Sequence, residues 1–363
     1  MSGKNSRIVF DGHCDTPSRI GAGSFQLEKR NGSGHIDIPR MREGGVSAQF
    51  FACCVDPDLP PGVWEETARH CLDSTVRAIE PLEGIKLALS GSEIKKALER
   101  ELISIMLSVE GGHVITSPAS LEYFYGLGMR SLAVTWKNSN RLADSSEGSR
   151  RWGGISPFGG EMVSEMNRLG VLIDCSHASR ESFFDILEHS SDPVILSHSC
   201  AAGICDIPRN ADDSQMKALA ESGGVICINF FPAFLDQKAN REIMKIWKPY
   251  REKKSALARR YGNDPERAGA ELLPDAMRRL EKIPMPGVSS VADHIVYAVE
   301  IAGIDHVGLG SDFDGIPVTP SGLEDISRVP ALERELAGRG FSQRDRDRIM
   351  GENLLRVVEL VCG

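Results

Sequence analysis

The sequence predicts an α/β protein, namely a (β/α)8 TIM barrel with a helical insertion between the seventh and eighth strands. Eight short apolar runs rich in β-branched residues recur along the chain, and most of them do not alternate with polar residues. Such runs are typical of parallel strands that are buried on both faces. Helical patterns separate them, which gives the β-then-α order of a barrel. The 363 residues are enough for two domains, but the eight units favour one elaborated barrel over residues 1–363.

The expected strands follow one another at spacings that leave room for a helix after each. They cover residues 8–11, 46–52, 103–109, 131–135, 171–174, 194–197, 225–229 and 307–310. Helical periodicity predicts helices over residues 66–80, 92–102, 118–127, 159–169, 179–189, 213–222 and 291–302. A last amphipathic segment, residues 342–360, is expected to close the barrel.

The longest interruption lies between the seventh and eighth strands, at residues 230–287. It is rich in Lys, Arg and Glu, above all between Lys245 and Lys254, and is interpreted as solvated helices. Its position after a strand places it at the C-terminal end of the barrel, where the active sites of this fold lie. Two interpretations stay open: a lid over the active site, or an insertion that is decorative or forms oligomers.

Composition argues against several classes of function. The formal net charge is −9, from 42 Lys and Arg against 51 Asp and Glu, which disfavours a broad surface for nucleic acid or anionic membranes. The polar start lacks the apolar stretch of a secretory signal, and no run of 18 apolar residues is available to span a bilayer. We therefore expect a cytoplasmic protein in which the nine cysteines are free thiols.

Residue types that bind metals occur at the C-terminal ends of five expected strands. A single His there is most often a core or loop residue, but a barrel brings these strand ends together around one mouth. Three imidazoles and three carboxylates have the ligand count for two metal ions. Two ions that share a water lower its pKa towards neutrality and polarise a carbonyl or phosphoryl oxygen. The six residues are His13, Asp15, Glu110, His177, His198 and Asp312.

Two of these strand ends are informative on their own. His13 and Asp15 follow the first strand, and because side chains alternate in an extended segment they point the same way. An imidazole nitrogen and a carboxylate oxygen so arranged are half of a divalent metal site. Glu110 follows an apolar strand and precedes two glycines, where a carboxylate without a cation would be costly.

Longer motifs resemble the renal dipeptidase, or membrane dipeptidase, family of zinc peptidases among the amidohydrolase-type barrels. The resemblance extends over nearly the whole chain, and a fixed order of many motifs is more specific than any metal motif alone. The motifs are Asp11-Gly-His-Cys-Asp15, Val109-Glu-Gly-Gly-His113, Gly154-Ile-Ser-Pro-Phe-Gly159, Asn167-Arg-Leu-Gly-Val-Leu-Ile-Asp174, Ser197-His-Ser199, Gly310-Ser-Asp-Phe-Asp-Gly315, Gly322-Leu-Glu-Asp325 and Glu352-Asn-Leu-Leu-Arg356.

The resemblance implies a role for each metal-binding position. His13 and Asp15 would bind one zinc ion, and His177 and His198 would bind the other. Glu110 would bridge both ions, where related barrels use a modified lysine. The implied cofactor is therefore two Zn²⁺, although cobalt, manganese or iron also suit such ligands.

The resemblance also assigns three residues to catalysis and substrate binding. Asp312 would take a proton from the bridging water, hand it to the leaving amine and contact the substrate. Arg209 matches the arginine that holds the substrate's terminal carboxylate, a task that suits a bidentate guanidinium. Trp136 stands where the family has a histidine that supports the tetrahedral intermediate, and its indole donates a single N–H and carries no charge. Because losing such a donor costs roughly 10²–10³ in rate, we expect weak activity on common dipeptides.

The predicted function is a metal-dependent dipeptidase that hydrolyses the peptide bond of dipeptides, including L-Xaa-D-Xaa, by a metal-bridging hydroxide. The expected partner is a small dipeptide, without nucleic acid or membrane, and a homodimer is implied only by the resemblance. One alternative is an amidohydrolase acting on another amide, lactam or ester, with Trp136 reshaping the pocket. A metal-binding pseudoenzyme is a further alternative, but it requires a broken ligand set, and all six positions are intact.

Overall fold

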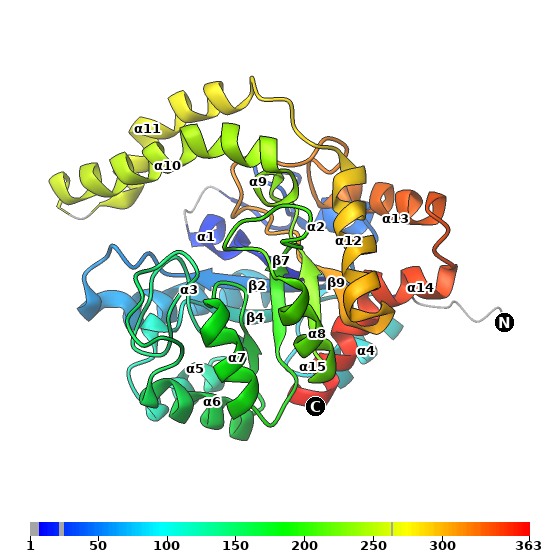
Figure 1. Ribbon diagram of the computed structural model, residues 1–363, viewed down its shortest axis with the longest axis horizontal. Helices are drawn as coiled ribbons and strands as arrows, with labels where there is room; N and C mark the ends of the chain where they lie inside the picture. Colours follow the sequence, from blue (N-terminus) through cyan, green and yellow to red (C-terminus); the bar gives the residue numbers. More distant parts are fainter. Residues whose placement is uncertain (1–6, 22–24, 263) are drawn as a thin grey trace.

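The computed structural model describes residues 7–21, 25–262 and 264–363, which form a parallel β-barrel surrounded by helices (Figure 1). Eight strands form the barrel, in which β2 pairs with both β1 and β4 and closes the ring. The predicted (β/α)8 TIM barrel is therefore confirmed. In barrel order the strands are β1 (Phe10–Cys14), β2 (Ala48–Cys54), β4 (Ile103–Glu110), β5 (Met129–Ala133), β6 (Leu172–Asp174), β7 (Ile195–Ser199), β8 (Val225–Ile228) and β9 (Val307–Leu309).

The strands are buried on both faces, which explains why the apolar runs do not alternate. Every residue of β4 is buried, and its pairing with β2 runs from Ala48 opposite Ser104 to Cys54 opposite Glu110. This register leaves the Glu110 carboxylate at the carboxyl end of the barrel. The strands thus supply a rigid frame that ends in polar side chains.

Helices cover the outside of the barrel. Several begin at a Ser or Asp whose side chain accepts a backbone N–H from the first turn, as at Ser156, Ser179 and Asp212. The α-helices of this layer are α1 (Thr16–Gly21), α2 (Ile38–Glu43), α3 (Trp64–Ile79), α4 (Gly91–Glu99), α5 (Pro118–Gly126), α6 (Pro157–Leu169), α7 (Arg180–His189), α8 (Asp213–Glu221), α12 (Val288–Ala302) and α13 (Val329–Gly338). Short 3₁₀ turns cover Pro61–Val63, Gly112–Val114, Ile304–His306 and Ile326–Arg328.

A ninth strand, β3 (Ile85–Leu87), is not among the eight that the sequence predicts. It pairs with the first residues of β4, which precede the part of β4 that pairs with β5. β3 has three residues and exposes Lys86, so it carries no apolar run that would reveal it. It extends the sheet beside β4 and is not a member of the closed ring.

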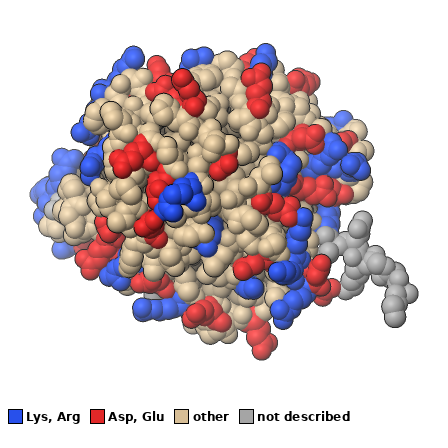
Figure 2. Space-filling model, turned by 90° about the horizontal axis from the view of Figure 1, so that it is seen from below, with Lys and Arg blue, Asp and Glu red and all other residues tan. Residues whose placement is uncertain are grey.

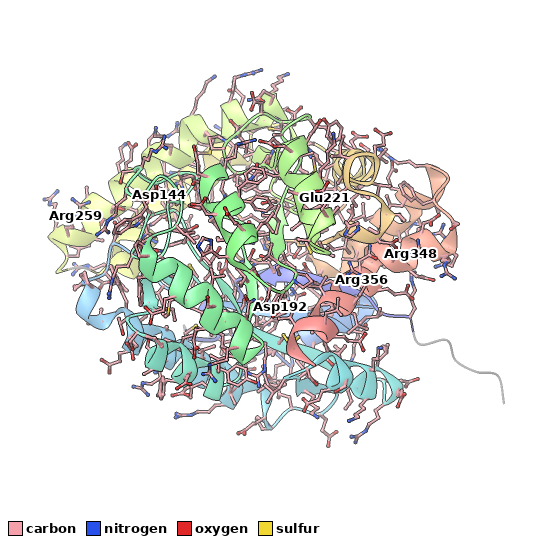
Figure 3. The ribbon with its side chains drawn as sticks, turned by 60° about the horizontal axis from the view of Figure 1, so that its bottom comes forward. Asp144, Asp192, Glu221, Arg259, Arg348 and Arg356 are labelled. Atoms are coloured by element: carbon pink, nitrogen blue, oxygen red, sulfur yellow. The ribbon has the colours of Figure 1, made fainter. Side chains whose placement is uncertain are left out.

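The insertion between the seventh and eighth barrel strands consists of three helices, α9 (Pro232–Leu235), α10 (Gln237–Arg260) and α11 (Pro265–Leu280). The Asp236 carboxylate accepts the backbone N–H of Ala239 at 2.7 Å and so caps α10. Helices α10 and α11 pack against each other, and we call this pair the helical hairpin. It lies above the barrel in Figure 1, and Figure 3 labels Arg259 towards its outer end. Because it follows β8, it stands at the carboxyl end of the barrel.

The predicted closing helix over residues 342–360 is interrupted. Helices α14 (Gln343–Asp347) and α15 (Asn353–Cys362) flank a π-helical turn at Arg348–Glu352, in which Gly351 has φ 177° and ψ −27°. A Cβ at Gly351 would lie 2.8 Å from the backbone nitrogen of Phe10. The π-helical turn lies where Gly351 packs closely against the start of β1. The hydrophobic periodicity of residues 342–360 gives no indication of this contact.

Helix α15 closes the end of the barrel opposite the helical hairpin. Leu354 is fully buried in a cluster that includes Phe10. Arg356, labelled in Figure 3, donates to the carbonyl oxygens of Gly223 at 2.9 Å and Asp305 at 3.0 Å, just before β8 and β9 begin. The last helix is therefore tied to the amino ends of the strands by both apolar and polar contacts.

The surface carries charges of both signs. Figure 2 views the molecule from below, and on this face acidic and basic side chains are interspersed. Among the described residues, no helix combines the length and apolar character needed to cross a bilayer.

Replacing a buried residue of α15 is expected to destabilise the barrel. Leu354→Ala removes a fully buried side chain and should lower the free energy of unfolding by about 2–5 kcal/mol. Leu360→Ala, on the same helix, is the matched control because Leu360 is 63% exposed and should change stability by less than about 0.5 kcal/mol. Urea denaturation followed by circular dichroism measures both. Equal effects of the two substitutions would contradict the closing role of α15.

Candidate metal centre

The strand ends bring together the six residues predicted to hold metals and move protons. Three of them lie within strands, in β1, β4 and β7, and the other three follow β1, β6 and β9 by no more than three residues. Each therefore takes its position from the barrel frame rather than from a long loop. The strand residues are His13, Glu110 and His198, and the residues after strands are Asp15, His177 and Asp312.

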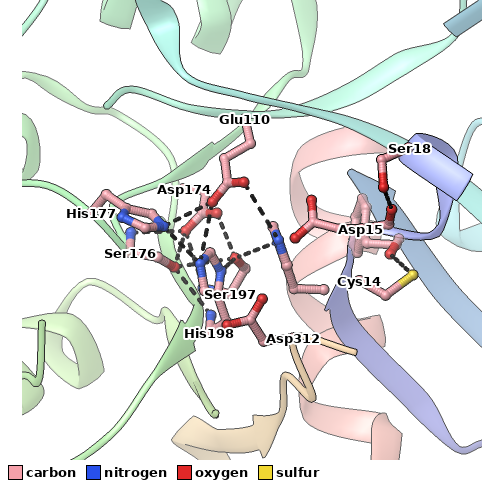
Figure 4. A network of polar contacts seen from close by, with 12 residues as sticks. Cys14, Asp15, Ser18, Glu110, Asp174, Ser176, His177, Ser197, His198 and Asp312 are labelled. Atoms are coloured by element: carbon pink, nitrogen blue, oxygen red, sulfur yellow. Dashed lines mark hydrogen bonds and ion pairs between the residues drawn. The ribbon is translucent and has the colours of Figure 1, made fainter. Parts of the chain in front are cut away.

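The Glu110 carboxylate is the centre of this group (Figure 4). Its Oε1 lies 2.8 Å from Nε2 of His177 and 3.4 Å from Nε2 of His198. Its Oε2 lies 3.9 Å from Nε2 of His13. The two oxygens of one carboxylate thus face imidazoles from opposite sides of the barrel mouth, β1 on one side and β6 and β7 on the other.

The ligand atoms form overlapping groups of the size that a metal ion requires. His13, Asp15 and Glu110 offer one atom each within 4.8 Å of one another, and Glu110, His177 and His198 form a second such group. Glu110 belongs to both groups. Asp312 joins a third group with His13 and His198. The structure thus brings the two predicted pairs of ligands to the two oxygens of one carboxylate, and metal binding by them stays a prediction.

The chemistry of these atoms fits divalent cations. His13 Nε2 and Asp15 Oδ1 are buried and have no hydrogen-bond partner within the described ranges. An unpaired buried polar atom is costly, and both residues belong to the group around Glu110. A mixed set of imidazole nitrogens and carboxylate oxygens suits zinc and neighbouring transition metals. A cation at this position would satisfy both atoms.

Burial and nearby charged groups shift the pKa values of the carboxyl groups in the centre. Burial raises the pKa of Asp15 well above its usual range, and the nearby Glu110 and Asp312 raise it further. Burial also raises the pKa of Asp312, to about 6. Burial acts on Glu110 in the same direction, but contacts with His13 and His177 outweigh it and hold the pKa of Glu110 well below its usual range. Carboxylates packed this closely repel one another unless cations lie among them.

The loop after β9 presents Asp312 through a left-handed backbone. Asp312 has φ 59°, which is uncommon for a residue other than glycine and frequent at functional sites. Asn229, just after β8, donates from Nδ2 to Asp312 Oδ2 at 2.9 Å. At Gly315 a Cβ would lie 2.0 Å from Asp15 Oδ2 and 2.5 Å from Asp312 Oδ1. Only glycine at this position leaves room for both carboxylates.

Arg209 lies beside the His177 and His198 side of the centre and is 4% exposed. Its Nη2 donates to the carbonyl oxygen of His198 at 3.2 Å, and its Nη1 donates to the carbonyl oxygen of Ser176. The guanidinium carbon lies 5.2 Å from the centre of the Phe234 ring, and Nε has no partner among the described residues. The structure thus holds this buried cation next to the predicted metal ligands.

Trp136 lines the cavity above the centre, just after β5. It is half-buried, and Lys137 Nζ lies 4.7 Å from the centre of its ring in a cation–π contact. Lys137 also pairs with Asp56 at 3.1 Å. A neutral ring with a neighbouring cation therefore occupies the position at which the resemblance implies a histidine.

The helical hairpin borders the same cavity, which has a volume of about 660 Å³. The hairpin residues of the wall come mainly from α10, with two from α11, Leu273 and Met277. Two polar contacts join the hairpin to the rim: Ser255 Oγ donates to Asp58, and Arg251 pairs with Glu147 at 3.4 Å. The hairpin residues of the wall include Met244, Trp247, Tyr250, Lys254 and Met277.

Sequence reasoning gave no role to Asn229, Asp174 and Ser197, all of which are buried beside the centre. Asn229 contacts Asp312, and Ser197 Oγ lies 2.7 Å from Nδ1 of His198 and donates to Asp174. Each lies at or next to the carboxyl end of a strand. A polar residue at that position was the available signal, but its partner is not visible in the sequence.

Comparisons with known proteins identify the family and agree with the fold. The family model described as membrane dipeptidase (peptidase family M19) matches residues 4–362. An uncharacterized dipeptidase of Schizosaccharomyces pombe is 31% identical over 371 residues, which is 96% of this chain and 80% of that protein.

Solved structures give the same picture. The dipeptidase AC, a metallopeptidase of family M19, has a TM-score of 0.80 and 25% identity, with 99% of this chain and 100% of that chain covered. A metallopeptidase of Rhodobacter sphaeroides, solved with a phosphinate mimic of the dipeptide L-Ala-D-Ala, has a TM-score of 0.79 at 24% identity, with 98% and 99% covered, and shows the shared fold. The resemblance in the sequence motifs is thereby confirmed, and this chain belongs to the membrane dipeptidase family, peptidase family M19.

Proposed function

We propose that the protein is a dinuclear zinc dipeptidase that hydrolyses the peptide bond of dipeptides, including L-Xaa-D-Xaa. Membership of a family of metal-dependent dipeptidases supports a metal-dependent peptidase. The single observation that carries the finer proposal is the sharing of Glu110 between two groups of ligand atoms. The dipeptide mimic bound to the related Rhodobacter sphaeroides protein adds support for a small peptide substrate.

In this proposal, His13 and Asp15 hold one ion, His177 and His198 hold the other, and Glu110 contacts both. Two divalent cations, when bound, would lower the pKa of a shared water and polarise the scissile carbonyl group. Zinc is proposed because nitrogen and oxygen ligands in low number suit it, and cobalt, manganese or iron also fit.

Asp312 is proposed to move the proton. Its carboxyl group shares a cluster with His13 and His198, so it lies beside both proposed ions. The amide of Asn229 fixes the orientation of Oδ2. In this position Asp312 takes the proton of the attacking water and delivers it to the nitrogen of the leaving amine, as a general base and then a general acid.

Arg209 and Trp136 are proposed to bind the substrate. Two backbone carbonyl groups orient the Arg209 guanidinium, whose unpaired Nε is suited to the terminal carboxylate of a dipeptide. Trp136 lines the cavity and donates at most one hydrogen bond from its indole. We expect this tryptophan to narrow the range of dipeptides that react well.

The helical hairpin is proposed to act as a lid. It borders the cavity, and its contacts with Asp58 and Glu147 join it to loops on the far side of the rim. Closing a site in this way excludes water from the reacting groups.

The cysteines, all nine of which are unpaired, support the proposed cytoplasmic location. The homodimer stays a prediction.

An amidohydrolase acting on another amide, a lactam or an ester is the second candidate. Trp136 favours it, because a neutral indole in the place of the family histidine changes the group that faces the substrate. Turnover of such compounds without turnover of any dipeptide would support this candidate.

Metal-loaded protein is expected to hydrolyse dipeptides. The assay compares L-Ala-L-Ala, L-Ala-D-Ala and a C-terminally amidated dipeptide before and after removal of metal with a chelator. Activity should vanish with the metal and return with two equivalents of Zn²⁺. The amidated compound should react at least about tenfold more slowly than the free dipeptide, because it lacks the carboxylate that pairs with Arg209. If the protein with two zinc ions bound hydrolyses no dipeptide at millimolar concentration, the proposal is wrong.

Asp312→Asn is expected to stop turnover without releasing metal. Loss of the proton carrier should lower kcat by roughly 10²–10⁴. Metal content, measured by plasma mass spectrometry, should remain near two ions per chain. Parallel loss of both ions and activity would identify Asp312 as a metal ligand instead.

Trp136→His is expected to raise kcat on dipeptides, by up to about 10²–10³, because it restores a charged donor to the developing oxyanion. The control is Trp152→His, since Trp152 is 41% exposed and its indole donates to the carbonyl oxygen of Asn140 at 2.8 Å. Steady-state kinetics on the same dipeptides measures both variants. An unchanged or lower kcat for Trp136→His would remove this explanation of weak activity.

A further inference from the structure

We propose that Asp174 and Ser197 form a hydrogen-bond relay that sets the tautomer of His198 and so presents its Nε2 lone pair to the metal centre. Both are positioning residues, since they act through the imidazole. The inference rests on the proposed metal binding, but it makes a claim about the metal-free protein that can be tested alone.

The Asp174 carboxylate, at the end of β6, receives only donors (Figure 4). Its Oδ1 accepts the backbone N–H of Ser176 at 3.0 Å, the backbone N–H of Ser197 at 3.1 Å and the hydroxyl of Ser176. Its Oδ2 accepts the hydroxyl of Ser197. Asp174 and Ser197 are 4% and 2% exposed, so water has little access to the relay.

The proton of the Ser197 hydroxyl is therefore committed to Asp174. Ser197 Oγ also lies 2.7 Å from Nδ1 of His198, and with its proton donated elsewhere it can only accept there. Nδ1 of His198 must then carry the hydrogen. A neutral imidazole has one N–H, so Nε2 of His198 carries the lone pair, and it lies 3.4 Å from Glu110.

The same hydroxyl reaches towards the other proposed metal site. Ser197 Oγ lies 3.5 Å from Nδ1 of His13, whose Nε2 has no partner among the described residues. One serine thus faces an imidazole from each site. His177 differs, because its buried Nδ1 has no hydrogen-bond partner in the described part of the chain. The relay should govern His198 most and His13 less. It reaches His177 only through His198, whose Nε2 lies 2.9 Å from Nε2 of His177 and can only accept a hydrogen bond there.

The substitution Asp174→Asn is expected to reverse the direction of the hydrogen bonds from residue 174 through Ser197 to His198. The position of Oδ1 faces two backbone N–H groups that cannot turn round, so the amide oxygen must take that position. The amide NH₂ then faces Ser197 Oγ and donates to it. The hydroxyl proton turns to His198 Nδ1, which moves the imidazole hydrogen to Nε2, the atom that faces Glu110.

Nuclear magnetic resonance of the metal-free, full-length protein with nitrogen-15-labelled histidine tests this directly. The ring-nitrogen shifts distinguish the two tautomers. We expect His198 to carry hydrogen on Nδ1 in the wild type and on Nε2 in Asp174→Asn. The matched control is Ser176→Ala, which removes a hydrogen bond to the same carboxylate without touching an imidazole, and it should keep the wild-type tautomer. Wild-type protein with hydrogen on Nε2, or Asp174→Asn with an unchanged tautomer, would overturn the relay.

Metal affinity is the second readout, measured by competition with a chromophoric zinc chelator. Asp174→Asn should weaken binding about 10–100-fold, and Ser176→Ala should weaken it much less. If Asp174→Asn fails to fold, Ser197→Ala replaces it, and the same weakening is expected because the orienting acceptor is lost. Affinity within about twofold of wild type in a folded Asp174 or Ser197 variant would count against the relay. Wild-type protein that binds no zinc but shows the expected tautomer would sink the proposed function and leave the relay intact.

Discussion

The burial of the Glu110 carboxylate among three imidazoles is the interaction on which the rest of the site depends. A charge in the interior is costly unless oppositely charged or donating groups surround it. His177 Nε2 lies 2.8 Å from Oε1 of this carboxylate, and β1 and β7 bring His13 and His198 to within 4 Å of its two oxygens. A closed parallel barrel is the arrangement that delivers residues so far apart in sequence to one point. Asp15 and Asp312 place two further carboxyl groups beside it, which supports the proposal that the centre holds cations.

Around this centre, backbone geometry and hydrogen bonds define where each group points. Asp312 depends on a left-handed residue, on Gly315 and on the amide of Asn229. His198 depends on Ser197, which in turn depends on Asp174. The helical hairpin borders the cavity, which has a volume of about 660 Å³. The strands thus position the proposed metal ligands, while the loops and the insertion form the walls of the cavity above them.

The barrel and the six polar residues at five of its strand ends were predictable because each is a local signal. A buried parallel strand is a short apolar run, and the polar residue that follows it is adjacent in sequence. The parts that escaped prediction depend on partners far along the chain. Asn229 and Asp312 are 83 residues apart, and β3 is too short to carry a pattern of its own. The break at Gly351 follows from the passage of that residue against the start of β1, which no periodicity within the last helix records.

The central claim is that one carboxylate serves two cations. Anomalous diffraction from crystals of the zinc-loaded protein, recorded above and below the zinc absorption edge, tests it most directly. We expect two peaks, one between Glu110 and the pair His13 and Asp15, the other between Glu110 and the pair His177 and His198. A single peak, or peaks that do not contact Glu110, would contradict it.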